Sequence, residues 1–255
     1  PLACVATSVD DIERAHASGQ LAVVLHLQGL SATGNSLDAL DLFHAAGVRV
    51  TQLTYKFRNQ LGDGCLEPSD SGLSEFGRRV VRRLNKLGTV IDISHAGART
   101  SLQAIDCAEG PVVASHSNAK AICESPRNLP DEHIRAVVGT GGVIGLCAFP
   151  SFVSEDGPSL EKLAEHAVYI AELVGPAHIG LGLDFSDEDE DDYLYYGYDE
   201  RYYPRPPWTW PTGIASPSDT ANLPGALLRA GFGASEVAGI MGGNLLRVFR
   251  ERWRS

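Results

Sequence analysis

The 255-residue sequence lacks the features that mark several large protein classes. It has no CxxC pair, and its five cysteines are scattered, so neither a thiolate zinc site nor a disulfide framework is indicated. No apolar run approaches the ~20 residues of a membrane-spanning helix, and no secretory signal is visible, so we expect no membrane partner. Free thiols favour a reducing compartment, and we therefore expect a cytoplasmic protein.

Three common nucleotide and hydrolase signatures are also missing. Neither GxGxxG nor GxxxxGK[ST] occurs, so no glycine-rich phosphate loop is predicted, and the absence of GxSxG removes the usual anchor of a serine hydrolase. Acidic residues outnumber basic ones by 32 to 21, and no basic cluster stands out. A net charge of −11 argues against nucleic acid as a partner, because phosphates require a basic face.

What the chain does have is a regular alternation of strand-like and helical segments, which predicts a parallel α/β sheet. We expect one domain over residues 1–255, because there is no repeat and no Gly/Ser linker. Six strands are predicted, and a closed (β/α)8 barrel needs two more, so either the first two are missing or the sheet is open. The predicted strands are about 21–27, 48–55, 89–94, 111–115, 142–147 and 178–184.

Helix ends are predicted from capping residues. We expect Ser8 and Ser36 to begin helices that Gly19 and Gly47 end. Further helices are expected at 73–87, 131–138 and 160–174, and two more near the C-terminus. Residues 186–211 are expected to be irregular, and the acidic run 187–192 lacks EF-hand spacing, which favours a solvated lid over a calcium site.

Polar residues stand where five of these strands end. The carboxyl ends of parallel strands meet at one rim, so we expect these side chains to lie close together. Imidazole, carboxylate and amide groups suit zinc or a similar borderline metal, and metal binding lowers the pKa of water from 15.7 to ~7. The residues are Gln28, Tyr55, His95, His116 and Asp184.

Simpler interpretations stay open. A histidine that ends a strand is commonly a hydrogen-bonded rim residue, although two of them with an aspartate weaken that interpretation. We expect His26 to be packed and hydrogen-bonded, and Arg127 to be either a surface charge or a clamp for a substrate carboxylate. Four histidines on expected helices are assigned to the surface: His16, His44, His133 and His166.

A set of ordered motifs resembles one family. QLTY followed by N and GDGC leads into SGLSEFGRRVVRRLNKLGTVIDISH, then SHS, SPRNLPD, HIGLGLDF and GGNLLRVF. From about Val5 to the C-terminus the chain is similar to the membrane (renal) dipeptidase family of zinc metallopeptidases. The resemblance implies a (β/α)8 TIM-type barrel of the amidohydrolase kind, with a two-zinc site that cleaves dipeptides and related small amides.

The resemblance also implies roles for individual residues. His95 and His116 correspond to the histidines of the second zinc, and Asp184 to the aspartate that touches the first zinc and accepts a proton from the water. Gln28 falls where the family has a glutamate that bridges both metals. The metal-ligand set it implies is therefore His95, His116, Asp184 and Gln28.

Substrate contacts follow from the same resemblance. Arg127 corresponds to the arginine that holds the substrate carboxylate, and Tyr55 falls where many members have a histidine that steadies the oxyanion. Asn59 completes the expected substrate-binding set. Asp184 and Tyr55 are thus the expected catalytic residues.

Two departures from the family shape the expected function. The His-x-Asp pair of the family's first strand has no counterpart here, and the amide of Gln28 cannot supply the charge that holds two dications together. A bacterial branch with Gln at this position has the same neighbouring pattern. We expect a metal-dependent dipeptidase with one or two zinc ions, the second of them doubtful.

The alternatives are a non-catalytic or truncated homologue with a degraded metal centre, and an amidohydrolase that acts on another small amide or lactam. An incomplete barrel leaves sheet edges and apolar surface exposed. We therefore also expect that this chain alone either associates with its own copies into a homo-oligomer or needs a missing N-terminal segment.

Overall fold

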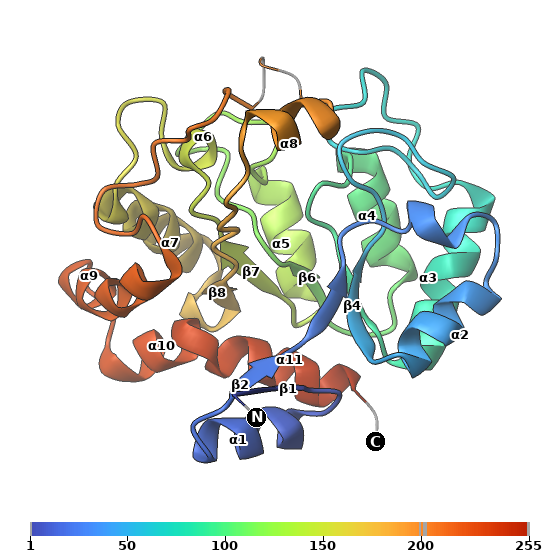
Figure 1. Ribbon diagram of the computed structural model, residues 1–255, viewed down its shortest axis with the longest axis horizontal. Helices are drawn as coiled ribbons and strands as arrows, with labels where there is room; N and C mark the ends of the chain where they lie inside the picture. The colour runs from blue at the N-terminus through green and yellow to red at the C-terminus, as the bar shows by residue number, and fades with distance from the viewer. Residues whose placement is uncertain (1, 199, 201–202, 254–255) are drawn as a thin grey trace. The chain divides into compact units, whose positions relative to one another are not determined.

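The computed structural model describes residues 2–198, 200 and 203–253 (Figure 1). Its internal contacts divide the chain into two compact units, and each is described by itself. The first comprises Pro1–Ala114, Ala136–Val143 and Leu245–Ser255, and the second comprises Ser115–Arg135 and Ile144–Asn244. That the whole chain forms one domain stays a prediction.

Four parallel strands in chain order form the sheet of the first unit, as the alternation predicted. Helix α2 (Asp38–Ala45) packs against β4, and α3 (Glu75–Leu87) packs against β5 and α4 (Ala98–Cys107) (Figure 1). Val50 pairs with Val90, and Ile91 with Val112, which aligns the strand ends. The strands are β3 (Leu25–Leu27), β4 (Val48–Gln52), β5 (Val90–Asp92) and β6 (Val112–Ala114).

The N-terminal part of this unit differs from the prediction. The expected strand 21–27 is divided at Val24 into β2 (Leu21–Val23) and β3, and β2 pairs with a strand that was not predicted, β1 (Ala3–Val5). Three residues are too short for a visible period of two, which explains why β1 left no sequence signal.

Capping residues explain where the first helices begin. Ser8 caps α1 (Val9–Ala17) through a reciprocal pair of hydrogen bonds with Asp11, and Gly19 follows the helix with a φ of 68°. The prediction that Ser36 caps the next helix was wrong. The residue that precedes α2 is Leu37, and its side chain makes no capping hydrogen bond.

The second unit contains the parallel pair of β7 (Val143–Leu146) and β8 (Ile179–Leu181), in which Ile144 pairs with Ile179. Helix α7 (Leu160–Val174) has the predicted bounds and packs against α9 (Leu223–Arg229). The second unit also contains α6 (Pro150–Val153) and α10 (Ala234–Ala238). Helix α5 (Asp131–Gly139) is divided between the two units, and α11 (Asn244–Arg252) belongs to the first unit except for Asn244. A π-helical turn at Gly239–Gly243 separates α10 from α11.

The acidic segment is partly helical, contrary to expectation. Residues Glu190–Tyr195 form α8, and the Asp189 carboxylate caps it by accepting hydrogen bonds from the N–H groups of Asp191 and Asp192. Negative charge in a first helical turn is favourable because it faces the positive end of the helix dipole. Positions 199, 201 and 202 of the expected irregular segment lie outside the described residues.

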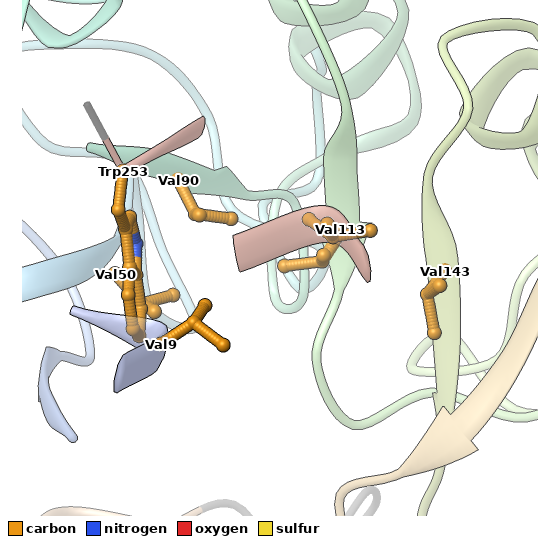
Figure 2. Packing of buried hydrophobic residues seen from close by; sticks show 7 residues of the cluster. Val9, Val50, Val90, Val113, Val143 and Trp253 are labelled. Atoms are coloured by element: carbon orange, nitrogen blue, oxygen red, sulfur yellow. The ribbon is translucent and has the colours of Figure 1, made fainter. Parts of the chain in front are cut away.

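A cluster of valines with one tryptophan forms the core of the first unit (Figure 2). Trp253 stacks on Phe249 with ring centroids 4.2 Å apart, and its indole N–H donates to the carbonyl of Arg49 at 3.3 Å. Residues beyond α10 thus pack against strands formed about 200 residues earlier. The buried members are Val9, Val50, Val90, Val113, Val143, Val248 and Trp253.

Within the described residues, no helix has both the length and the apolar character needed to cross a membrane. The five cysteines are all free, as expected. The β1–β2 region leaves Leu2, Val5 and Leu21 exposed. Self-association of the chain stays a prediction.

Replacing Trp253 with alanine is expected to lower the free energy of unfolding by about 3–5 kcal/mol, because it leaves a cavity beside the valine cluster. Urea denaturation followed by circular dichroism measures the change. The matched control is Leu2→Ala at a 94% exposed site, where less than about 0.5 kcal/mol is expected. Equal losses in the two variants would show that Trp253 does not anchor this core.

Candidate active site

Three of the predicted site residues come together in the first unit. The imidazole of His95 is 3% exposed and stacks on the Tyr55 ring, with centroids 4.3 Å apart and planes inclined by 29°. The amide nitrogen of Gln28 lies 3.3 Å from His95 Nε2. The ends of β3, β4 and β5 therefore deliver an imidazole, a phenol and an amide to one place, as the sequence predicted.

His95 has an unusual backbone conformation, and so does Asp184 of the second unit. Their φ angles are 65° and 59°, and they are the two residues other than glycine with positive φ in the described part of the chain. The left-handed region costs an L-residue about 1–2 kcal/mol, and such a cost is commonly retained where function requires the geometry. Both residues stand where a strand ends and were predicted to bind metal.

The Asp184 carboxylate contacts a buried thiol that sequence reasoning missed. Cys147 lies directly after β7, and its Sγ is 3.9 Å from Asp184 Oδ2. Burial, and secondly the negative charge of Asp184, raise the pKa of the Cys147 thiol. The thiol therefore stays protonated and can donate a weak hydrogen bond to the carboxylate.

His116 and Arg127 are both buried in the second unit. The hydroxyl of Ser115 lies 2.7 Å from His116 Nδ1, and this contact orients the ring. An Nη atom of Arg127 donates to the carbonyl of His116 at 3.2 Å, and its guanidinium lies 5.3 Å from the centre of the Phe152 ring. Arg127 is 2% exposed, so of its two predicted interpretations the surface charge is wrong.

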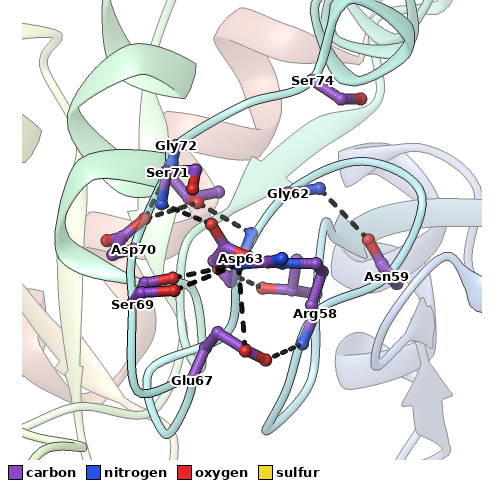
Figure 3. Close-up of polar contacts among 12 residues, drawn as sticks. Arg58, Asn59, Gly62, Asp63, Glu67, Ser69, Asp70, Ser71, Gly72 and Ser74 are labelled. Carbon is purple, nitrogen blue, oxygen red and sulfur yellow. Dashed lines mark hydrogen bonds and ion pairs between the residues drawn. The ribbon is translucent and has the colours of Figure 1, made fainter.

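Asn59 is engaged within its own loop. Its side-chain oxygen accepts a hydrogen bond from the N–H of Gly62 (Figure 3) and another from the N–H of Leu61. Its amide nitrogen donates to the carbonyl of Leu53 at 2.8 Å. A role for Asn59 in substrate binding stays a prediction.

Other histidines depart from what the sequence suggested. His133 and His166 were expected at the surface, but they are 4% and 0% exposed. His166 accepts a hydrogen bond from the N–H of Ala119 and lies 3.0 Å from the carbonyl of Val153, so it contacts both the loop after β6 and the end of α6. His26 was expected to be packed and hydrogen-bonded, but the residue is exposed; its Nε2 lies 3.3 Å from Asp92 Oδ2, within ion-pair distance.

The donor chemistry fits a borderline dication. Neutral imidazole, one carboxylate and an amide oxygen are all ligands that zinc accepts. The contact between Gln28 and His95 places two of these donors side by side within one unit. In the described residues no group of three or more His, Cys, Asp or Glu side chains forms a ready metal cage.

The strands are parallel and follow chain order, and polar residues stand where they end, as in parallel α/β proteins whose sites lie at the carboxyl ends of the strands. The sequence profile of the membrane dipeptidase family, peptidase family M19, matches residues 2–192. The chain belongs to this family.

Known relatives agree in sequence and in structure. The dipeptidase aclJ of Aspergillus oryzae is 31% identical over 250 residues, which cover 95% of this chain and 55% of that protein. An amidohydrolase from Pseudomonas aeruginosa superimposes with a TM-score of 0.92 at 31% identity, over 99% of this chain and 79% of that one.

A metallopeptidase from Rhodobacter sphaeroides, solved with a phosphinate mimic of the dipeptide L-Ala-D-Ala, gives a TM-score of 0.85 at 27% identity, over 99% of this chain and 69% of that one. The fold is therefore the expected amidohydrolase-type barrel, of which β3 to β8 are the described strands. The chain spans about half the length of the curated relatives it matches.

His166 is expected to make stability depend on pH. Burial lowers the pKa of His166 below its usual 6.5. As the pH falls, the imidazole therefore binds a proton more readily in the unfolded state than in the folded state. Its contribution to stability is present above pH 6.5 and is lost as the pH falls toward the folded-state pKa. Urea denaturation between about pH 7.5 and pH 5 should show a shallower loss in His166→Gln than in the wild type.

His16→Gln is the matched control, because His16 is exposed on α1 and its loss should leave the wild-type dependence on pH intact. Parallel pH profiles for the wild type and His166→Gln would contradict this prediction.

Proposed function

We propose that this chain is a metal-dependent dipeptidase that hydrolyses the peptide bond of dipeptides or related small amides. One observation carries the proposal: His95 and Asp184, which correspond to metal ligands of the family, both hold left-handed backbones at strand ends. Strain at those two positions is understandable if each side chain must point at a reacting centre. The named dipeptidases among the relatives support the same function.

The metal in this proposal is one zinc ion. His95, His116 and Asp184 would hold it, with the amide oxygen of Gln28 as a further donor. A single carboxylate among neutral donors balances one dication better than two, which is why we infer one ion. When bound, zinc supplies an activated water at neutral pH and polarises the scissile carbonyl.

Each protein group has a distinct task in the proposed reaction. The Asp184 carboxylate accepts the proton of the attacking water and can pass it to the departing amine. Arg127 binds the terminal carboxylate of the substrate through paired N–H donors and so fixes its orientation. The Tyr55 hydroxyl donates a hydrogen bond to the oxyanion that forms at the attacked carbonyl.

The proposed substrate is a small dipeptide with a free carboxylate, and another small amide or a lactam is the alternative within the same chemistry. The buried guanidinium of Arg127 supports the dipeptide, because an anion repays the desolvation of that cation. We also propose the cytoplasm as the location, since five free cysteines suit a reducing compartment.

Metal removal tests the proposal directly. Hydrolysis of a dipeptide panel that includes L-Ala-D-Ala should stop when the protein is treated with a chelator, and should return when Zn²⁺ is added. His116→Ala should lower kcat/KM by about 100-fold or more, because removing a ligand costs at least as much as disturbing its supporting residues.

His16→Ala, at an exposed histidine on α1, is the control and should retain wild-type activity. Hydrolysis that persists after complete metal removal would rule out the proposed mechanism. A metal-loaded protein without activity on any small amide would instead support a non-catalytic homologue.

The role of Arg127 is tested with paired substrates. Arg127→Lys should raise KM for dipeptides with a free carboxylate by about tenfold or more, because a lysine cannot form the paired donor geometry. The same dipeptides with a C-terminal carboxamide should be poor substrates for both proteins. Arg135→Lys on an exposed face of α5 is the control. An unchanged preference for the free carboxylate in Arg127→Lys would refute the assignment.

A further inference from the structure

The loop between β4 and α3 contains a buried carboxylate that the proposed reaction does not use. Asp63, in the GDGC motif, is 1% exposed. One carboxylate oxygen forms an ion pair with Arg58, and the other accepts a hydrogen bond from the N–H of Ser71 at 2.5 Å (Figure 3). The carboxylate therefore ties two distant parts of the loop together from inside.

The backbone next to Asp63 runs alongside the segment that begins with His95. The N–H of Cys65 donates to the carbonyl of His95 at 2.7 Å, and the N–H of Gly97 donates to the carbonyl of Asp63 at 2.8 Å. Gly64 and Ala96 form the antiparallel bridge between these two bonds. The three residues 63–65 thus pair with 95–97 as a short strand would.

The GDGC motif also packs closely against the segment that contains Tyr55. A Cβ atom on Gly64 would lie 2.4 Å from the carbonyl carbon of Lys56 and 2.6 Å from the carbonyl oxygen of Tyr55, so glycine is required there. Leu66 donates its N–H to the carbonyl of Lys56 at 2.9 Å. The motif therefore holds the ends of β4 and β5 at a fixed separation, and with them the stacked pair of Tyr55 and His95.

Both the side chain and the backbone of Asp63 are held by hydrogen bonds. Besides the two carboxylate contacts and the bond to Gly97, its own N–H donates to the hydroxyl of Thr100 at 3.0 Å. Arg58 is about half exposed, and its hydrogen bond to Asp63 raises the pKa of the guanidinium, so the guanidinium stays charged at every physiological pH. A buried carboxylate that loses its partner would reorganise the loop around it.

We propose that Asp63, paired with Arg58, is a positioning residue that holds the backbone of His95 in its left-handed conformation and so aims the imidazole at the metal. The inference rests on the proposed function, because it gives His95 a metal to bind. Asp63 contacts neither substrate nor metal, and its effect passes through Cys65 and Gly97.

The test compares Asp63→Asn with Glu67→Gln. Glu67 belongs to the same loop and also contacts Arg58, at 3.8 Å, so its replacement removes the same charge without touching the 63–65 and 95–97 pairing. The first measurement is titration of the metal-free protein with Co²⁺ alone, followed by visible absorption. The second is the hydrogen exchange of the Gly97 amide in the metal-free protein.

In Asp63→Asn we expect Co²⁺ to bind about tenfold more weakly, with an altered absorption spectrum, because a supporting residue of a ligand is lost. The Gly97 amide should exchange about tenfold faster, because its hydrogen bond opens locally. Glu67→Gln should match the wild type in both measurements. A stable Asp63→Asn protein with wild-type cobalt affinity and wild-type exchange would overturn the inference.

If Asp63→Asn does not fold, Arg58→Gln tests the same inference. The Arg58 side chain is half exposed, so its replacement leaves the buried backbone amides of Cys65 and Gly97 in place. It should change the same two measurements in the same direction, and wild-type values for both would overturn the inference. A wild-type protein that binds no Co²⁺ would refute the proposed function instead. The exchange of Gly97 would still report whether Asp63 holds the segment.

Discussion

A single backbone hydrogen bond, from the N–H of Cys65 to the carbonyl of His95, is the constraint on which the arrangement of the predicted site residues in the first unit depends. It fixes the peptide next to a left-handed histidine, a conformation that an L-residue leaves unless neighbouring groups hold it. The bond is possible only because Gly64 lets the loop approach the backbone of Tyr55 and Lys56. The close packing of the loop backbone at Gly64 thereby restrains the backbone that carries the His95 imidazole.

In the second unit a predicted site residue also has a left-handed backbone, and different contacts surround it. Asp184 is also left-handed, and its carboxylate lies against a thiol that burial keeps protonated. The side chain of Asn118 hydrogen-bonds to both backbone groups of Cys147. It accepts from the N–H of Cys147 and donates to its carbonyl. Each unit therefore holds buried polar contacts around its left-handed site residue.

Periodicity and capping were enough to predict most of the regular structure. Helix α7 has the predicted bounds, and α1 begins after Ser8 as expected, because local hydrogen bonds and one apolar face decide both. The failures have physical reasons. Strand β1 is too short to show a period, and α8 forms in a segment where charge suggested only solvation, because Asp189 caps it.

The site was predictable to the extent that strand ends determine it. Gln28, Tyr55 and His95 converge because successive parallel strands deliver their last residues to one rim. The supporting residues were not predictable in this way. Asp63 reaches its partners through a loop whose path has no sequence period, and Cys147 is a single thiol whose neighbour lies 37 residues later in the chain.

The packing of Trp253 against Arg49 has a consequence for the order in which the chain can fold. The core of the first unit needs residues that are synthesised about 200 positions after its first strands, and the whole second unit emerges in between. The valines of β4, β5 and β6 therefore lack part of their native packing until α11 and Trp253 have been synthesised, and contacts between residues so distant in sequence slow folding. The second unit contains no residue beyond Asn244, so all of its residues have been synthesised before Trp253 is added.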